Sequence, residues 1–281
     1  MLRNSLDTRV RTASDVAQLT DSPLVGRIGY DAASERGLTL ISDAITSPRA
    51  EAFRRLRTNL QYLGRGQGGN SFVITSSVPD EGKTSTAINT ALVLADAGLR
   101  VLLIDADMRR PRVGQSLRLE DAAGLSTILI GRASLREVVQ VAGMGTLQVL
   151  TSGPVPPNPA ELLGSISMVR LLECATHEYD AVVIDAPPLL PVTDAAILSG
   201  MTTGALLVVG SGEVRAPQLA AALESLESVE GRLLGIVLNK LRGKDVGYSA
   251  YRNRSGQGPE PRRVARRAAG EEPADRQRVI A

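Results

Sequence analysis

Several residue types on which other protein classes depend are scarce in this sequence. Its 281 residues include one cysteine, Cys174, no tryptophan and only 2% aromatic residues. A single cysteine cannot form a disulfide within the chain, and no pair of cysteines offers a metal site. We therefore expect a protein of the reducing cytoplasm, with a core built mainly from valine, leucine, isoleucine and alanine.

Long apolar runs are also missing. The best run, Ala205 to Gly210, is far shorter than the ~20 apolar residues that cross a bilayer. Arg3, Asp7 and Arg9 follow Met1 without an apolar segment between them, which argues against a secretory signal. The sequence therefore predicts neither a membrane-spanning helix nor an export signal.

The main body of the chain lacks a strong excess of charge of either sign. The net charge is +2, but residues 243–281 hold nine basic and five acidic residues, so this tail contributes +4 and the rest of the chain −2. The calculated basicity thus belongs to the tail, and we expect no nucleic acid binding by the folded body. The tail is polar and carries glycine and proline, a composition that predicts disorder.

What the sequence does contain is a regular alternation of short apolar runs with helical stretches. Runs rich in Val, Leu and Ile are typical of strands buried on both faces, so the alternation predicts an α/β fold with a mostly parallel central sheet flanked by helices on both faces. The predicted strands are Ser71–Thr75, Arg100–Ile104, Leu147–Thr151, Ala181–Ile184, Ala205–Val209 and Leu234–Leu238. The predicted helices are Arg49–Leu63, Lys83–Ala97, Ser134–Val141, Pro159–Ala175, Thr193–Ser199 and Ala216–Val229.

Three parts follow from this pattern. Residues 1–48 resemble a short helix and a strand followed by a polar linker, and this arm is too small for a core of its own, so it must dock or stay mobile. Residues 49–242 form the predicted main domain, and residues 243–281 form the predicted tail.

The stretch SSVPDEGKTST, residues 76–86, lies between a predicted strand and a predicted helix. A loop that ends in Gly-Lys-Thr in this context is typical of a phosphate-binding loop. The backbone N–H groups and the helix end would hold phosphate oxygens, Lys83 would reach the β- and γ-phosphates, and the Thr84 hydroxyl would bind Mg²⁺. Ser77 replaces the first glycine of the usual pattern, so a simple glycine-ended turn before a helix is the alternative.

Two further predicted strands end in acidic residues. VLLIDADMRRP places Asp105 and Asp107 at the carboxyl edge of the sheet, and AVVIDAPP places Asp185 there. Ligands of open α/β folds bind at this edge, and like charges so close are costly unless a cation or a proton is shared. The alternative for the first pair is a solvated surface turn.

Together these motifs resemble the bacterial tyrosine kinase family, P-loop enzymes that regulate capsular and extracellular polysaccharide export. The three stretches just quoted resemble the family's Walker A, Walker A-prime and Walker B motifs, and the resemblance covers roughly residues 49–241. Supporting stretches in the expected order are EAFRRLRTNL, GPVPPNPAELLGS, PVTDAAIL and LLGIVLNK. The resemblance implies a P-loop NTPase-like fold and an ATP- and Mg²⁺-dependent protein-tyrosine autokinase.

The resemblance also implies a role for each matching residue. Asp105 matches the family's proposed base toward the tyrosine hydroxyl, Asp107 and Asp185 match acids that organise the metal together with Thr84, and Asn239 matches a position near adenine, where capping of a turn is the alternative. The catalytic set is Asp105, Asp107 and Lys83. The ATP-binding set is Val78, Asp80, Glu81, Gly82, Lys83, Thr84, Ser85, Thr86 and Asn239.

Two arginine-bearing features each have an alternative interpretation. Arg109, directly after the Asp-x-Asp pair, would either neutralise phosphate or pair with neighbouring acids. Glu51, Arg54 and Arg57 share one helix face, where a solvated charged surface is the default. The resemblance implies instead the helix through which subunits of a ring contact one another.

The chain departs from the family pattern in two places. Family members end in a cluster of tyrosines that serve as phosphate acceptors, whereas this chain has only Tyr248 and Tyr251 there. Asp80 stands where relatives usually have glycine, so the loop must turn without glycine's freedom at positive φ. Asp tolerates such a conformation better than most residues.

The resemblance further implies a transmembrane chain-length regulator of polysaccharide synthesis as activator, a homo-oligomer, a cognate tyrosine phosphatase and a place at the inner face of the membrane. Residues 1–48 resemble the cytosolic segment that follows the second membrane helix in fused relatives, so either a separate membrane protein supplies the activator or the coding start lies upstream. A membrane-recruited P-loop ATPase shares the fold, but its signature lysine is replaced here by Val78. A nucleotide-binding regulator without kinase activity is the third interpretation.

Overall fold

The computed structural model describes residues 7–32, 47–63, 70–142 and 147–243. All of them belong to one of the two units into which the chain divides, Met1–Gly247. The other unit, Tyr248–Ala281, lies outside the described residues, and with it the prediction of a disordered tail.

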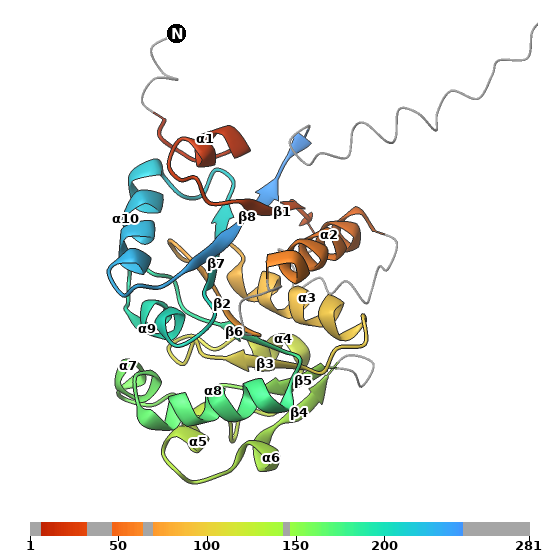
Figure 1. The fold of residues 1–281 in the computed structure, drawn as a ribbon, viewed down its shortest axis with the longest axis vertical. Helices are drawn as coiled ribbons and strands as arrows, with labels where there is room; N and C mark the ends of the chain where they lie inside the picture. The colour runs from red at the N-terminus through yellow and green to blue at the C-terminus, as the bar shows by residue number, and fades with distance from the viewer. Residues whose placement is uncertain (1–6, 33–46, 64–69, 143–146, 244–281) are drawn as a thin grey trace, which may run out of the picture. The chain divides into compact units, whose positions relative to one another are not determined.

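The described residues form one eight-stranded sheet in the order β1-β8-β7-β2-β6-β3-β5-β4 (Figure 1). All neighbouring strands are parallel except β4, which pairs antiparallel with β5. This confirms the predicted α/β class with a mostly parallel sheet. The strands are β1 (Leu24–Gly29), β2 (Ser71–Ser76), β3 (Val101–Asp105), β4 (Gln140–Ala142), β5 (Leu147–Leu150), β6 (Ala181–Asp185), β7 (Ala205–Gly210) and β8 (Leu233–Leu241).

Helices cover both faces of this sheet (Figure 1). Helices α2 and α3 pack on one face, while α5, α7, α8, α9 and α10 belong to the other. The helices are α1 (Ala13–Ala17), α2 (Pro48–Leu63), α3 (Lys83–Ala95), α4 (Val113–Leu117), α5 (Leu125–Leu129), α6 (Leu135–Val138), α7 (Pro159–Leu163), α8 (Ile166–Glu178), α9 (Asp194–Gly200) and α10 (Ala216–Glu227).

The central strands divide their side chains between two cores. In β3, Leu102 and Ile104 lie in the core under α5 and α8, whereas Val101 and Leu103 lie in the core under α2 and α3. This division follows from the two-residue period of a strand. Because both faces are covered, every residue of β3 is apolar until the strand reaches Asp105.

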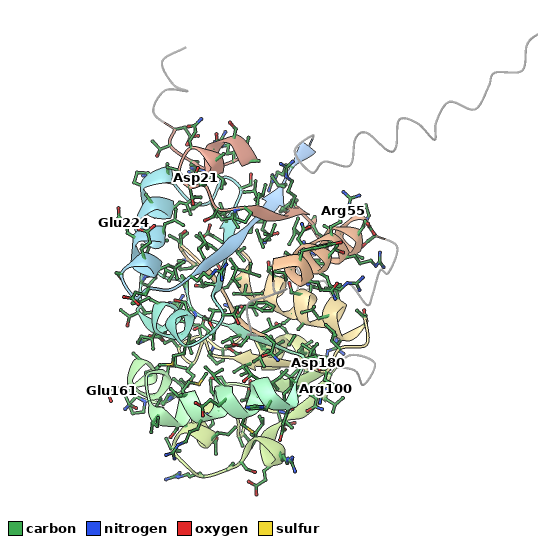
Figure 2. The ribbon with its side chains drawn as sticks, in the orientation of Figure 1. Asp21, Arg55, Arg100, Glu161, Asp180 and Glu224 are labelled. Carbon is green, nitrogen blue, oxygen red and sulfur yellow. The ribbon has the colours of Figure 1, made fainter. Side chains whose placement is uncertain are left out.

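Neighbouring strands are held in register near their beginnings. Arg100, just before β3, donates a bidentate pair of hydrogen bonds from Nε and Nη2 to Asp180, just before β6, with the shorter bond at 2.7 Å (Figure 2). A hydrogen bond from the Arg100 side chain lowers the pKa of Asp180 to about 2. In this register the last residues of the two strands, Asp105 and Asp185, are direct partners.

Two predicted helices are wrong in extent. The helix predicted for 134–141 is the short α6, after which the chain extends into β4 and pairs with β5. The helix predicted for 159–175 is two helices, because α7 ends at Gly164 and Ser165 starts a new one by accepting a hydrogen bond from Met168 N. Apolar periodicity revealed neither the early end of α6 at Val138 nor the serine cap at Ser165.

The described part of the N-terminal arm docks on the main domain. Strand β1 extends the sheet by pairing with β8, and Val25 and Ile28 are buried in the core beneath α2. Ahead of it, Val10 N donates to Val214 O at 2.9 Å. Of the two predicted alternatives, docking is therefore the one that residues 7–32 adopt. No helix within the described ranges is long and apolar enough to cross a membrane.

Candidate functional site

The predicted phosphate loop lies at the carboxyl end of β2, between that strand and α3 (Figure 1). Asp80 has φ 66° and Gly82, at the helix start, has φ 93°. Asp80 thus takes the positive φ that the sequence required of it. At Gly82 a side chain is excluded as well, since an added Cβ would lie 2.2 Å from Asn239 Nδ2. The loop is therefore a tight turn that presents the first turn of α3.

Glu81 anchors this loop from beneath. Its carboxylate is buried and accepts hydrogen bonds from Val78 N at 2.8 Å and from Gly210 N at 2.9 Å. Burial raises the pKa of Glu81 to about 7, even though these backbone donors act to lower it. The side chain of Glu81 therefore joins the loop to the end of β7 and faces the fold, so that only its backbone is placed to meet a ligand.

Asn239, on β8, holds the same loop from another strand. Its Nδ2 donates to Glu81 O at 2.9 Å, and the residue is buried. One of the two N–H donors of the Asn239 amide is thus used by the loop backbone. A role in binding the base would use the amide oxygen or the second N–H.

Lys83 lies between two of the predicted acids. Its Nζ is 2.7 Å from Asp107 Oδ2 and 3.8 Å from Asp185 Oδ1. Burial acts to lower the pKa of Lys83, but the charges of Asp185 and Asp107 outweigh it and raise the pKa. The structure therefore brings together the loop lysine and the ends of β3 and β6, as the sequence patterns predicted separately.

Asp105 is buried and bonded only to backbone among the described residues. It accepts hydrogen bonds from Asp107 N at 3.2 Å, Arg112 N at 3.1 Å and Val113 N at 2.9 Å. Burial and the nearby charge of Asp185 raise the pKa of Asp105 to about 8. The carboxylate thus holds the turn after β3 together and has an unusually high affinity for a proton. Because Asp105 is buried, the alternative of a solvated surface turn is excluded.

Asp185 has unsatisfied oxygens. Both are buried without a hydrogen-bond partner in the described part of the chain, and burial raises the pKa of Asp185 to about 6. A buried carboxylate whose oxygens lack hydrogen bonds is costly, and the ion pair of Asp185 with Lys83 at 3.8 Å supplies charge but no hydrogen bond. This group therefore fits a cation or its bound water. No group of three His, Cys, Asp or Glu side chains able to hold a metal exists among the described residues. A metal here would thus need oxygens from Thr84, water or a phosphate as well.

Arg109 pairs with an acid that sequence reasoning missed. Its Nε and Nη2 donate to the two oxygens of Asp194 at 2.9 and 3.1 Å, and Asp194 is fully buried. This hydrogen-bonded pair raises the pKa of Arg109. Of the two alternatives for Arg109, pairing with an acid is therefore the one observed. PVTDAAIL was quoted only as a supporting stretch, and nothing in its pattern indicated this partner.

The predicted subunit-contact residues lie on α2. Glu51 forms ion pairs within the helix, at 3.3 Å with Arg54 and 3.5 Å with Arg55. Arg57 instead donates to Val93 O of α3 at 3.2 Å. All three residues are half-buried, and Arg57 also connects α2 to the helix that follows the phosphate loop. The candidate acceptors Tyr248 and Tyr251 lie outside the described residues.

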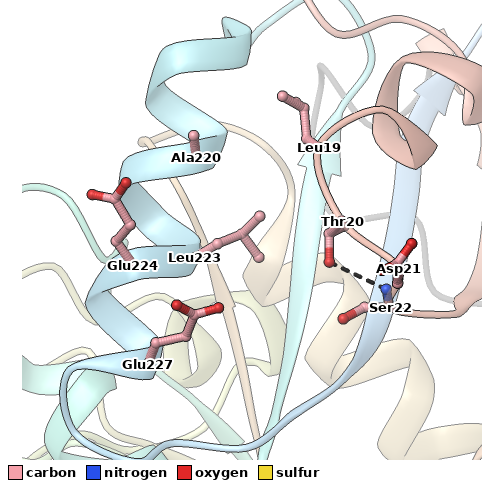
Figure 3. Close-up of a pocket in the computed structure, with 8 residues that line it drawn as sticks. All are labelled: Leu19, Thr20, Asp21, Ser22, Ala220, Leu223, Glu224 and Glu227. Atoms are coloured by element: carbon pink, nitrogen blue, oxygen red, sulfur yellow. Dashed lines mark hydrogen bonds between the residues drawn. The ribbon is translucent and has the colours of Figure 1, made fainter.

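A hollow of about 600 Å³ lies away from this site, between the segment after α1 and helix α10 (Figure 3). Leu19 and Leu223 line it together with the carboxylates of Asp21, Glu224 and Glu227. It contains none of the predicted site residues. The hollow therefore does not coincide with the predicted site. We place the site at the phosphate loop, because the loop, Lys83 and the acidic residues converge there.

Comparisons with known proteins show what the chain as a whole is similar to. The AAA domain family matches residues 80–229. Tyrosine-protein kinase YwqD of Bacillus subtilis is 42% identical over 212 residues, which cover 74% of this chain and 90% of YwqD. Tyrosine-protein kinase etk of Escherichia coli is 39% identical over 189 residues, 67% of this chain, and the match spans only 26% of the Etk sequence.

Solved structures agree with these relatives. The kinase domain of Escherichia coli Etk superimposes with a TM-score of 0.78 and 31% identity, covering 82% of this chain and 94% of that domain. The chimerical protein CapA2B2 superimposes with a TM-score of 0.76 and 34% identity, covering 83% of this chain and 100% of the CapA2B2 chain.

Proposed function

This chain belongs to the family of bacterial tyrosine-protein kinases. We propose that it is an autokinase, which uses Mg²⁺ and ATP to phosphorylate tyrosine residues of this same protein. The observation that carries the proposal is the convergence of Lys83, Asp107 and Asp185 beside the phosphate loop. The family membership agrees with the resemblance expected from the sequence motifs.

The phosphate loop is proposed to bind the nucleotide. The N–H groups of Val78 and Thr86 already donate to Glu81 and Gly82, so the phosphates would be held by N–H groups between them and by the positive end of α3. Lys83 would leave Asp107 and bind the β- and γ-phosphates. The proposed ATP-binding set stays Val78, Asp80, Glu81, Gly82, Lys83, Thr84, Ser85, Thr86 and Asn239. The anchor formed by Glu81 supports this assignment, because it holds the turn without occupying the ligand side of the loop.

Magnesium fits the acidic side of the site. Thr84 and Asp185, with Asp107, are the residues that would hold it, and the unsatisfied oxygens of Asp185 support this choice. When bound, Mg²⁺ would neutralise phosphate charge during transfer.

Asp105 is proposed to accept the proton of the attacking tyrosine. A phenol has a pKa of about 10 and is a poor nucleophile at neutral pH until a base accepts its proton. The pKa of Asp105, raised to about 8, makes its ionised form a stronger proton acceptor than an ordinary aspartate, and it lies near the working pH, where a base is most effective. Asp105, Asp107 and Lys83 form the proposed catalytic set, in which Lys83 and Asp107 position charge.

The wider biological role is proposed from the family. Residues 49–242 would be the kinase domain, residues 1–48 the docking arm and residues 243–281 the tail that carries the acceptors Tyr248 and Tyr251. Glu51, Arg54 and Arg57 would join subunits of a homo-oligomer. A transmembrane chain-length regulator would activate the kinase at the inner face of the membrane and so control capsular or extracellular polysaccharide export, with a tyrosine phosphatase reversing the modification.

A phosphotyrosine assay tests the proposal. The purified chain is incubated with Mg-ATP, with and without the cytoplasmic tail of a candidate membrane partner. Labelling should appear in the wild type, vanish in Lys83→Met and fall sharply in the Tyr248→Phe/Tyr251→Phe double variant. Lys240→Met is the matched control, because Lys240 pairs with the exposed Glu213. A wild type that hydrolyses ATP without labelling tyrosine would favour the ATPase interpretation instead.

A further inference from the structure

Arg49, near the start of α2, reaches across to the helix that follows the phosphate loop. Its Nη2 donates to Ser85 Oγ at 2.9 Å and its Nη1 donates to Gly29 O at 3.3 Å. The guanidinium also lies over the ring of Phe53, 5.4 Å from its centroid. Three elements, β1, α2 and α3, therefore hold this side chain beside the third residue of α3.

The positively charged guanidinium of Arg49 is largely shielded from water. Its Nε is buried without a hydrogen-bond partner among the described residues. Burial lowers the pKa of Arg49, although the charge of Asp31 opposes this shift. An arginine nevertheless stays protonated in proteins, so the positive charge persists.

The position of this charge is unfavourable for the protein by itself. The N-terminal end of a helix carries a partial positive charge that disfavours cations within the first turn. Arg49 and Lys83 both place positive groups at that end of α3, and only Lys83 lies within reach of the acids at the ends of β3 and β6. A polyanion bound at the loop would attract the charge of Arg49, so that this charge would then stabilise the bound state.

We propose that Arg49 is a positioning residue for the nucleotide: it fixes the Ser85 hydroxyl and adds positive charge beside the phosphates. The proposal rests on the proposed nucleotide site and adds a residue that no motif of the phosphate loop contains. Its contribution applies equally before and during phosphoryl transfer, because Arg49 reaches the site through Ser85 and not through the transferred phosphate. It should therefore affect nucleotide affinity and KM rather than kcat.

Titration calorimetry with MgADP tests the inference. Arg49→Met should weaken binding by about tenfold, or ~1.4 kcal/mol, and raise KM for ATP to a similar extent while kcat at saturating ATP is unchanged. Arg49→Lys should lie between, since an ammonium cannot hold Ser85 Oγ and Gly29 O in one planar fork. Arg55→Met is the matched control, because Arg55 is exposed on the same helix and paired with Glu51.

A double-variant cycle separates positioning from simple stabilisation of the fold. If Arg49 acts through Ser85, the effect of Arg49→Met should shrink in a Ser85→Ala background. Additive effects, unchanged affinity in Arg49→Met or a loss in kcat would each overturn the inference. Should Arg49→Met melt well below Arg55→Met, the same cycle is run with Arg49→Lys. A wild type that fails to bind MgADP would instead refute the nucleotide site itself.

Discussion

Replacing Glu81 with glutamine removes a titrating group from beneath the phosphate loop. In the folded protein burial raises the pKa of Glu81 from 4.5 to about 7. Between these pH values the folded state holds a proton that the unfolded state releases. The stability contributed by this group is therefore fully present below about pH 4.5 and is lost as pH rises toward about 7. At 1.4 kcal/mol per pKa unit, the loss is roughly 3 kcal/mol.

The Glu81→Gln variant lacks this pH dependence. Two backbone N–H groups, those of Val78 and Gly210, donate to the two oxygens of Glu81. The amide nitrogen of the glutamine cannot accept either bond, whereas both oxygens of the wild-type carboxyl group, ionised or protonated, keep a lone pair that can. That lost bond should cost about 1–3 kcal/mol. The variant should thus be less stable than the wild type at about pH 5, and the difference should shrink by about 2.5 kcal/mol toward about pH 8, because part of the loss has already occurred at the lower pH.

Urea unfolding across this pH range measures the difference. Far-UV circular dichroism is the suitable signal, because the chain has no tryptophan. Asp105 and Asp185 titrate in both proteins and cancel in the difference. Glu213→Gln is the matched control, since Glu213 is exposed and should give curves parallel to the wild type. Parallel curves for Glu81→Gln would refute the reasoning about its burial.

Two further predictions concern the turn of the loop. Gly82→Ala should abolish nucleotide binding and lower the free energy of unfolding by about 1–3 kcal/mol. The reason is that the added Cβ would lie 2.2 Å from Asn239 Nδ2 and that φ at this position is 93°. Nucleotide titration measures the binding, and wild-type affinity would contradict the prediction. Asp80→Gly should keep or tighten nucleotide binding and change stability by less than about 1 kcal/mol, since relief of the positive φ offsets glycine's entropy. A large loss of affinity in that titration would show that the carboxylate has a role of its own.

Part of the site was predictable because it follows from local patterns. An apolar strand that ends in aspartate places that residue at the carboxyl edge of a parallel sheet, and so Asp105 and Asp185 could be expected at the same edge. The Gly-Lys-Thr ending of the loop likewise specified its place between β2 and α3. These predictions needed only the end of each apolar run, whereas the pairing of β3 with β6 came from the structure.

The remaining contacts join residues far apart in the chain. Arg109 and Asp194 are 85 residues apart, and Asn239 and Glu81 are 158 residues apart. Neither pair has a sequence signature, because each partner also fits an ordinary surface or cap role. The inward direction of the Glu81 side chain was equally hidden, since a loop glutamate is usually solvated.

The sequence by itself determined the α/β class, most of the strands, the phosphate loop and the acidic strand ends, because periodicity and motif spacing act over short ranges of chain. Only the tertiary structure decided which polar groups are buried, what they bond to and how their pKa values shift. Those properties depend on the loss of water around a side chain and on partners brought from other elements. Glu81 shows the distinction: its place in the loop is local, but its role as an anchor exists only where β7 supplies Gly210.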